Sequence, residues 1–398
     1  MSDKKADSNV VKIVHWIVQI RGGLGALFLL LMVLAISGSQ TILPDDSSNE
    51  RSISDLLQTT PWPEADSLFR TNPRWLGADD AYSVDLGNNR VLWLFADTFV
   101  AISDQHTRRE SVMIRNSIGI QSGYDPCTAS IQFCWRVQEE KPRSFFPEEN
   151  DIWFWPGHGI VVEDKLLIFL MAIRSSSGGL GFQSAGWRAV IVSNFEEIPS
   201  KWHLRWLDTP ANIYGLVVSG SVIQMGEFIY AFCDEEPSHH THLVRWPAAQ
   251  IMKEDLSQPQ WWTGEEGGWV MQQNLLQKPQ PLFSEGQSEF SVHYEPSLNQ
   301  FIEIQTVGFG KAELGFRLAD HPTGRWSSIR NFYRPEEYEI ADIMIYAAKA
   351  HPCLRGADMV LTYATNSFDF KKLIAHDYLY YPRFLRVNFK ISTNKSAP

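Results

Sequence analysis

Carboxylate side chains stand beside several apolar, strand-like runs of this sequence. Asp79 and Asp80 are adjacent, and Asp97 follows the apolar run of residues 90–95. Glu289 precedes another such run, residues 290–306. Hydrolysis of a glycosidic bond needs two carboxyl groups across the bond, one to donate a proton and one to activate water or attack. Asp79, Asp80 and Asp97 are therefore candidate catalytic residues, and Glu289 is a further candidate.

Each of these carboxylates also has a simpler interpretation. Adjacent Asp residues often bond backbone amides in a turn, and this would account for Asp79 and Asp80. Asp97 and Glu289 sit where strands end or begin, so each is equally compatible with a solvated strand tip. Both interpretations stay open on the sequence alone.

Further polar side chains suit the recognition of sugar hydroxyls. Asp80 is adjacent to Asp79, and Arg115 and Asn116 lie on the strand expected after Asp97. His158 and His351 open two strand-turn-strand units at equivalent places, and an imidazole can bond a hydroxyl or tune a carboxyl. These five residues are the candidate substrate-binding residues. The alternatives are a buried ion pair for Arg115 and structural roles for the histidines.

No cofactor is predicted. The sequence contains no P-loop and no nucleophile-elbow motif, and no dinucleotide-binding glycine motif precedes a helix. Carboxylate oxygens suit Ca²⁺, but no spacing demands an axial ion. His239, His240 and His242 follow two glutamates in a polar loop, and solvated histidines are expected there. No metal site is therefore predicted.

The N-terminus predicts export. Residues 22–39 contain no charged side chain and follow a basic start that includes Arg21. The apolar core is short for a membrane-spanning helix and suits a cleaved signal peptide, although an uncleaved anchor is the alternative. Either form leaves the body periplasmic or extracellular. In that location Cys127 and Cys134 are able to pair, the alternative being four unpaired thiols.

Composition limits the partners. The formal net charge is −11, and no cluster of Lys and Arg appears. Binding to nucleic acid depends on such clusters, so a nucleic-acid partner is excluded. The 15 Trp, 12 Tyr and 23 Phe favour strands and also suit stacking on sugar rings. A polysaccharide or other glycan is the expected partner, with the membrane as a second one if the leader stays attached.

Strand-turn-strand units recur along the body of the chain. The units at residues 160–170, 221–232, 291–304 and 349–363 each join two apolar runs through a tight polar turn. Such sheets bury both faces only by stacking around an axis. We therefore expect an all-β, five-bladed β-propeller over residues 70–390, with residues 380–389 closing the ring; a β-sandwich pair is the alternative. Residues 1–39 form the leader, 40–69 a linker and 391–398 a tail.

Several short motifs resemble the DUF4185 proteins, a group of five-bladed propellers. The motifs are Gly77-Ala78-Asp79, Leu94-Phe95-Ala96-Asp97-Thr98, Arg115-Asn116-Ser117, Ser288-Glu289-Phe290-Ser291-Val292, Tyr346-Ala347-Ala348-Lys349-Ala350-His351-Pro352 and Tyr381-Pro382-Arg383-Phe384. Some members of that group are endo-acting arabinan hydrolases, and related glycosidases place three acids around the axis. The resemblance implies that Asp79 and Asp97 match the first two acidic positions, with Glu289 the third.

These observations predict a glycoside hydrolase that acts on an envelope or extracellular polysaccharide, such as an arabinan. Asp79 and Asp97 are expected as base or nucleophile and as a group that tunes a neighbouring pKa, and Glu289 as the proton donor. The third unit departs from related enzymes because residues 215–220 contain no acid and the first one after them is Glu227. A non-catalytic propeller that binds glycans or scaffolds envelope proteins is therefore the alternative.

Overall fold

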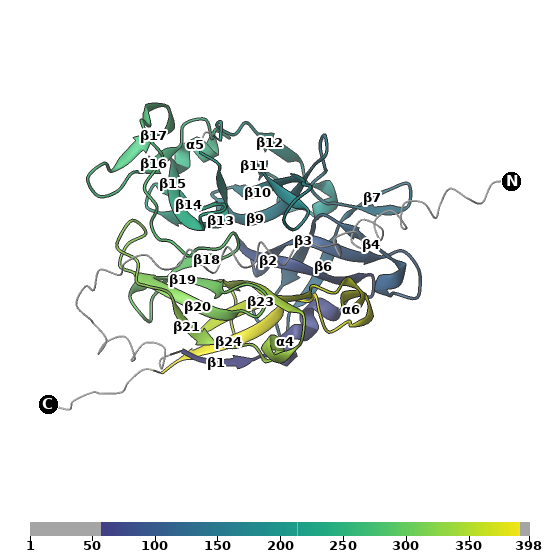
Figure 1. Ribbon diagram of the computed structural model, residues 1–398. Coiled ribbons are helices and arrows are strands. Elements are labelled where there is room, and N and C mark those ends of the chain that lie inside the picture. Colours follow the sequence, from purple (N-terminus) through teal and green to yellow (C-terminus); the bar gives the residue numbers. More distant parts are fainter. Residues whose placement is uncertain (1–56, 213, 391–398) are drawn as a thin grey trace. The chain divides into compact units, whose positions relative to one another are not determined.

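The described residues, 57–212 and 214–390 of the computed structural model, form five antiparallel sheets that follow one another along the chain (Figure 1). This confirms the predicted five-bladed β-propeller. The expected leader or anchor at residues 1–39 and the tail at 391–398 lie outside the described residues. Across the part of the chain that is described, no helix is both long and apolar enough to cross a membrane.

Each blade is one sheet, numbered I to V along the chain. Blade I contains β2 (Trp75–Gly87), β3 (Arg90–Ala101), β5 (Ser117–Ser122) and β6 (Ser130–Cys134), with β4 (Ser111–Ile114) also paired to β3. Blade II contains β9 (Ile152–Val162), β10 (Lys165–Ser175), β11 (Phe182–Val192) and β12 (Leu204–Leu207). Blade III contains β13 (Leu216–Met225), β14 (Phe228–Glu235), β15 (His240–Pro247), β16 (Gln260–Trp262) and β17 (Trp269–Met271).

Blade IV contains β18 (Ser291–Glu295), β19 (Gln300–Val307), β20 (Glu313–Ala319) and β21 (Arg330–Tyr333). Blade V contains β22 (Ile343–Ala350), β23 (Met359–Ser367), β24 (Arg383–Phe389) and β1 (Leu57–Pro61). A small ribbon of β7 (Arg136–Gln138) and β8 (Lys141–Arg143) and the short helices α4 (Pro63–Asp66), α5 (Ala248–Met252) and α6 (Phe370–Ala375) complete the described elements.

The four predicted strand-turn-strand units are the first two strands of blades II to V. Their turns fall where the sequence offers residues that tolerate a positive φ, for example Gly226 between β13 and β14 and Asn299 between β18 and β19. In blade I the equivalent turn contains Asn88 and Asn89, both with positive φ. The turn residues therefore set the register of each hairpin.

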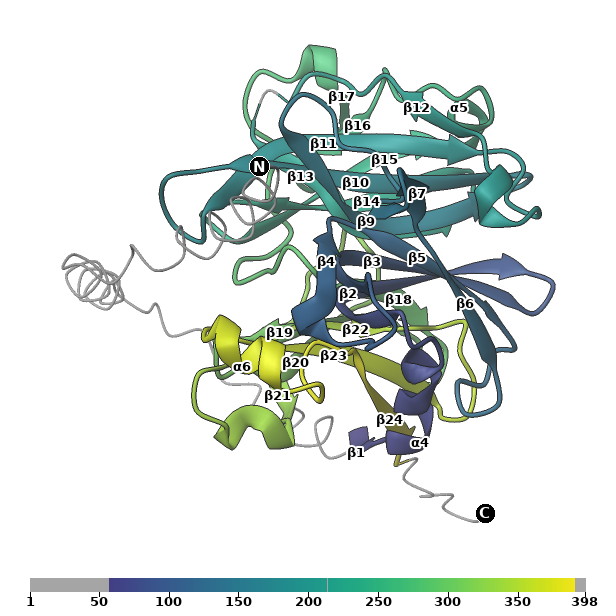
Figure 2. The ribbon, with the colours of Figure 1, turned by 90° about the vertical axis from the view of Figure 1, so that its right-hand side faces the viewer.

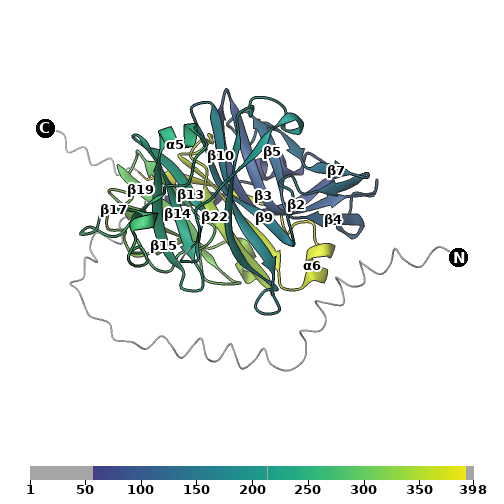
Figure 3. The same cartoon turned by 90° about the horizontal axis from the view of Figure 1, so that it is seen from above.

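The first strands of the blades meet around the axis. β2 contacts β9, β9 contacts β13, β13 contacts β18, β18 contacts β22, and β22 contacts β2 again. In Figure 3 the labels of β2, β9, β13 and β22 gather in the middle of the body. The approach of β9 to β13 is close because Gly157 has no side chain: a Cβ there would lie 2.3 Å from the carbonyl oxygen of Ser219. Side chains on these five strands are therefore brought to one axis.

The hydrophobic core is divided among the interfaces between neighbouring blades. Five clusters of buried apolar side chains lie between blades I and II, II and III, III and IV, IV and V, and V and I. The cluster between blades V and I is rich in aromatic rings, including Trp93 of blade I edge-on to Phe384 of blade V with ring centroids 5.9 Å apart. Much of the aromatic content therefore holds the blades together.

The ring closes within blade V, where the strand nearest the N-terminus pairs with the last strand. β1 runs antiparallel to β24, with Leu57 opposite Phe389 and Pro61 opposite Leu385. Figures 1 and 2 show β1 beside β24 and α4. The expected linker at residues 40–69 is described from residue 57 onward, and there it supplies this closing strand. The structured body therefore begins before the expected boundary at residue 70. The ring is closed by the pairing of β24 with β1 inside blade V.

Candidate active site

Asp79 lies in the first strand of blade I, where the strand is irregular. The register of β2 against β3 shifts on both sides of Asp80, so Asp79 and Asp80 lie in a strand rather than in the alternative turn. The hydroxyl groups of Tyr346 and Tyr380 donate hydrogen bonds to Asp79 Oδ2 at 2.7 and 3.0 Å. The other oxygen, Oδ1, is buried and has no hydrogen-bond partner.

This environment favours the protonated form of Asp79. Burial raises the pKa of Asp79 to about 8, and the negative charges of Asp97 and Glu289 add to the rise, whereas the two tyrosine hydrogen bonds oppose it. The electrostatic effect of Asp97 and Glu289 on Asp79 shows that the structure brings these three predicted acids together. Asp79 therefore carries a proton at neutral pH.

Asp80 and Glu289 share one cation. Lys349 Nζ, fully buried in blade V, lies 3.1 Å from Asp80 Oδ1 and 3.4 Å from Glu289 Oε1. It also stands 4.3 Å from the centroid of the Tyr82 ring. Burial raises the pKa of Asp80 although Lys349 opposes the shift, and a hydrogen bond with Glu289 raises it further. Asp80 is only 4% exposed, so it faces Lys349 and Glu289 rather than solvent.

Asp97 is held by two donors from neighbouring segments. The indole N–H of Trp155, on β9, donates a hydrogen bond to Asp97 Oδ1 at 3.0 Å. Arg115 forms an ion pair with Asp97 Oδ2 at 3.3 Å, and its guanidinium lies over the ring of Trp153. Burial raises the pKa of Asp97, whereas Arg115 and Trp155 favour its charged form. The Asp97 side chain keeps 15% of its surface exposed, so it remains accessible to water.

The remaining predicted binding residues serve the scaffold. His158 accepts from the backbone N–H of Val222 through Nδ1 and contacts the carbonyl oxygen of Ser83 through Nε2, so it bridges blades I, II and III. His351 lies between the hydroxyl groups of Ser83 and Thr362. Both ring nitrogens of each histidine are thus occupied by protein groups.

Asn116 is completely buried as well. Its side-chain N–H groups donate to the carbonyl oxygens of Phe146 and Phe154, and its oxygen accepts from the Phe146 N–H. These three bonds fix the segment before β9. The structure therefore does not bring Asn116 or His351 to the carboxylates, in contrast to Asp80 and Arg115.

Sequence reasoning missed an acid in blade III. Asp234 lies near the end of β14, buried to 2% exposure, and its charge contributes to the electrostatic environment of Tyr82. Burial raises the pKa of Asp234 to about 7, and Glu236 and Glu235 add to the rise. The first strand of this unit has no acid before the turn residue Glu227, as expected, and Asp234 follows Glu227 on the second strand.

A repeat in the sequence would have revealed Asp234. Phe232-Cys233-Asp234 on β14 corresponds to Phe95-Ala96-Asp97 on β3, the second strand of blade I. Lys349, Tyr346 and Tyr380 were missed as site residues for another reason. They come from blade V, and only the closed ring brings them to Asp79 and Asp80.

The structure bears on two further expectations, the pairing of the cysteines and the solvated histidine loop. Cys127, Cys134, Cys233 and Cys353 are all unpaired, as in the alternative to a disulfide. The histidine cluster of blade III is not a solvated loop, because His242 lies on β15 and its side chain is fully buried. With Glu235 and His240 it is the group of described residues suited to hold a metal ion.

Several solved structures of low sequence identity are similar to this chain. A protein of Bacteroides ovatus ATCC 8483 described as a "putative hydrolase" superposes with a TM-score of 0.66 and 16% identity, covering 91% of this chain and 100% of that one. A GH62 alpha-L-arabinofuranosidase catalytic domain of Coprinopsis cinerea gives a TM-score of 0.45 and 10% identity, over 84% of this chain and 97% of that one.

A GH43_1 enzyme of Xanthomonas citri complexed with xylotriose gives a TM-score of 0.44 at 9% identity, covering 88% of this chain and 96% of that one. No curated protein matches the sequence. The model of the family described as a domain of unknown function, DUF5005, matches residues 64–389, and this corrects the DUF4185 resemblance of the short motifs. Because the match spans nearly all of the propeller, the chain belongs to the DUF5005 family.

Proposed function

We propose that this propeller is a glycoside hydrolase that acts on an envelope or extracellular polysaccharide. The observation that carries the proposal is the division of charge among three neighbouring carboxyl groups. The pKa of Asp79 is raised to about 8, so this carboxyl group is protonated at neutral pH. The other two carboxyl groups each lie beside a cation, Asp97 beside Arg115 and Glu289 beside Lys349. A glycosidase needs one protonated and one ionised carboxyl group at the same pH.

The geometry favours a different assignment of roles from the one expected from the sequence. Asp79 is the proton donor, because its environment stabilises the protonated carboxyl. Asp97 is the base or nucleophile, since Trp155 and Arg115 favour its ionised form and part of it stays exposed. Glu289 adds the negative charge that keeps the proton on Asp79, and Lys349 holds Glu289 in place.

The proposal is tested by incubating the purified protein with a panel of arabinans, galactans, xylans and other envelope polysaccharides. Release of reducing ends is measured for the parent, Asp79→Asn, Asp97→Asn and Asp164→Asn, the last being an exposed turn residue. The parent and Asp164→Asn should be active, and the other two should lose about 100-fold or more. Activity that survives in both site variants would exclude these residues as catalysts.

A glycan-binding or scaffolding propeller is the outcome that replaces this proposal if the panel is not cleaved. In that case the same polysaccharides should still bind, and binding should weaken in Arg115→Ala, whose guanidinium is partly exposed beside Trp153. If the protein neither cleaves nor binds any polysaccharide of the panel, carbohydrate is excluded as its ligand class.

Export is a second part of the proposal, supported by the uncharged segment at residues 22–39. A fusion of residues 1–56 to a reporter that is active only outside the cytoplasm should be active. Separation of membranes from soluble material then distinguishes an anchor from a cleaved leader. A silent but stable fusion would contradict export.

A further inference from the structure

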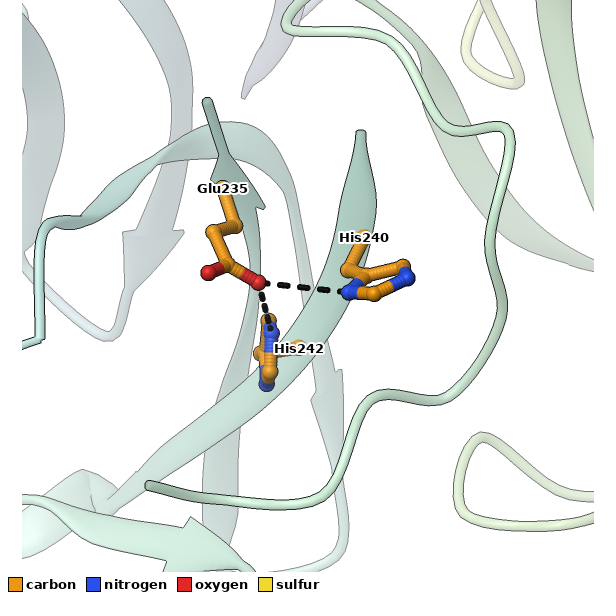
Figure 4. A group of neighbouring side chains, drawn as sticks. All are labelled: Glu235, His240 and His242. Carbon is orange, nitrogen blue, oxygen red and sulfur yellow. Dashed lines mark hydrogen bonds and ion pairs between the residues drawn. The ribbon is translucent and has the colours of Figure 1, made fainter. Parts of the chain in front are cut away.

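Two histidines and a glutamate face one another at the end of the β14–β15 hairpin. Glu235, the last residue of β14, pairs directly with His240, the first residue of β15. His240 and His242 are two positions apart on the strand and so lie on the same face. Figure 4 shows both imidazoles directed at the Glu235 carboxylate.

The spacing of the three side chains fits one metal ion. Glu235 Oε2 lies 3.3 Å from His240 Nδ1 and 3.2 Å from His242 Nε2, and all three ligand atoms lie within 4.8 Å of one another. Ligand bonds of about 2.0–2.2 Å in a tetrahedral site place neighbouring ligand atoms about 3.3–3.5 Å apart. The ligand atoms therefore need little movement to surround an ion.

Burial prepares the same groups for coordination. The His242 side chain is fully buried, Glu235 is 12% exposed and His240 is 39% exposed. Nδ1 of His242 has no hydrogen-bond partner, whichever nitrogen carries the proton. Moving the proton from Nε2 to Nδ1 to free Nε2 for a metal therefore breaks only the contact with Glu235, which the metal replaces. The exposed edge of His240 leaves solvent access for a further ligand.

Lys278 orients the carboxylate from its other side. It bonds Glu235 Oε1, so Oε2 is the oxygen that faces the two histidines. The lysine belongs to the segment between β17 and β18, which also carries Glu289 and is tied to β15 by the bond from Thr241 N to Phe283 O. An ion here would thus fix the hairpin end against which the Glu289 segment packs.

We propose that Glu235, His240 and His242 bind a Zn²⁺-class transition-metal ion, with a remaining position open to water. Two imidazoles and one carboxylate are a donor set typical of zinc, whereas Ca²⁺ takes oxygen ligands alone. The site uses none of the carboxylates of the proposed hydrolase and does not depend on that activity. The simpler alternative is a polar cluster in which Glu235 accepts from both histidines and Lys278.

The test uses untagged full-length protein stripped with a chelator and titrated calorimetrically with ZnCl₂. We expect one equivalent per chain, and Co²⁺ at the same site should give the visible absorption bands of a tetrahedral complex. His240→Gln should weaken binding about tenfold or more. His239→Gln, the exposed neighbouring histidine, is the matched control and should bind as the parent does.

Lys278→Gln supplies a change in the opposite direction. The Gln amide can still donate a hydrogen bond to Glu235 Oε1, but it places no positive charge beside the cation, so zinc binding should tighten. Glu235→Gln should weaken it, and circular dichroism and thermal unfolding establish that each variant is folded. The proposal is overturned if no saturable equivalent is bound, or if His239→Gln weakens binding as much as His240→Gln does. Asp79→Asn should keep the zinc affinity, which separates this site from the proposed hydrolase.

Discussion

At the scale of single residues, Asp79 is a partly buried carboxyl group that the fold keeps protonated. In the unfolded chain it would ionise near its ordinary pKa of 3.8, whereas the folded protein raises the pKa to about 8. Between these values the folded state binds a proton that the unfolded state does not. The free energy of unfolding therefore falls as the pH rises from about 4 to about 8.

Asp79→Asn should remove this pH-dependent loss of stability. The amide has nearly the shape of the protonated carboxyl, and its oxygen can still accept from Tyr346 and Tyr380. The variant should therefore resemble the parent at pH 5 and melt about 2 °C or more above it at pH 9. Thermal unfolding across this range checks the effect, with Asp164→Asn as the control. A melting difference that stays constant with pH would contradict the assigned pKa.

Trp155→Phe should change how Asp97 titrates. The indole N–H lowers the pKa of Asp97, so its removal should raise that pKa. For the proposed hydrolase the acid limb of the kcat/KM profile should therefore move to higher pH, because Asp97 acts in its ionised form.

Trp202→Phe is the matched control for that change, because it loses an indole hydrogen bond to Glu197 O away from the carboxylates. Its pH profile should coincide with that of the parent. An unchanged acid limb in active Trp155→Phe would show that Asp97 is not the ionised catalytic group.

The sequence predicted the acids of the site better than their partners. Asp79, Asp97 and Glu289 lie beside strand-like runs, and a propeller brings such runs to one axis. Asn116 and His351 carry the same kinds of polar atoms, but the backbone and hydroxyl groups that occupy them come from distant segments. Lys349 had no local signal as a site residue, because its partners lie in blades I and IV.

At the scale of elements, β1 completes a sheet made otherwise from the opposite end of the sequence. Leu57 is buried in the cluster between blades IV and V, whereas Gln58 on the other face of the strand is exposed. The hairpins were predicted because each is local, with its turn residues in the sequence between two apolar runs. The pairing of β1 with β24 has no such local signal, and residues 57–61 resembled a linker.

Leu57→Ala should weaken blade V. Loss of the buried side chain removes apolar contacts and leaves a cavity, which should lower the free energy of unfolding by about 2–3 kcal/mol. Gln58→Ala, a truncation on the exposed face of the same strand, should change it by less than about 0.5 kcal/mol. Urea unfolding followed by tryptophan fluorescence measures both values. Equal stability of the two variants would mean that β1 does not contribute to the folded ring.

At the scale of the whole molecule, histidines hold blades together in their neutral form. Burial lowers the pKa of His158 to about 4. Burial also lowers the pKa of His351, and the nearby charge of Lys349 adds to this effect. Below pH 6.5, the ordinary pKa of histidine, these two side chains bind protons in the unfolded chain but stay neutral in the folded protein. Stability conferred by these groups is thus fully present above pH 6.5 and is lost as the pH falls toward 4.

His158→Gln should flatten this acid dependence. At pH 7.5 the variant should be about 1–3 kcal/mol less stable, because at least one of the bonds to Ser83 O and Val222 N is lost. The difference in stability should shrink at pH 5, because protonation of His158 in the unfolded chain destabilises the parent there and the Gln side chain does not titrate. Urea unfolding at both pH values measures it, and His239→Gln should track the parent. A gap that widens at pH 5 would contradict a neutral buried His158.

The pairing of β1 with β24 has a consequence for how the ring is assembled. During synthesis β1 emerges from the ribosome before blades I to IV, whereas its partner β24 emerges after them. Blades I to IV each consist of consecutive strands and contain all of their own sheet, whereas blade V has to wait for both ends. The two ends of the described body also lie side by side. Joining them with a short linker and opening the chain between two other blades would therefore move the seam to another sheet while keeping every strand neighbour unchanged.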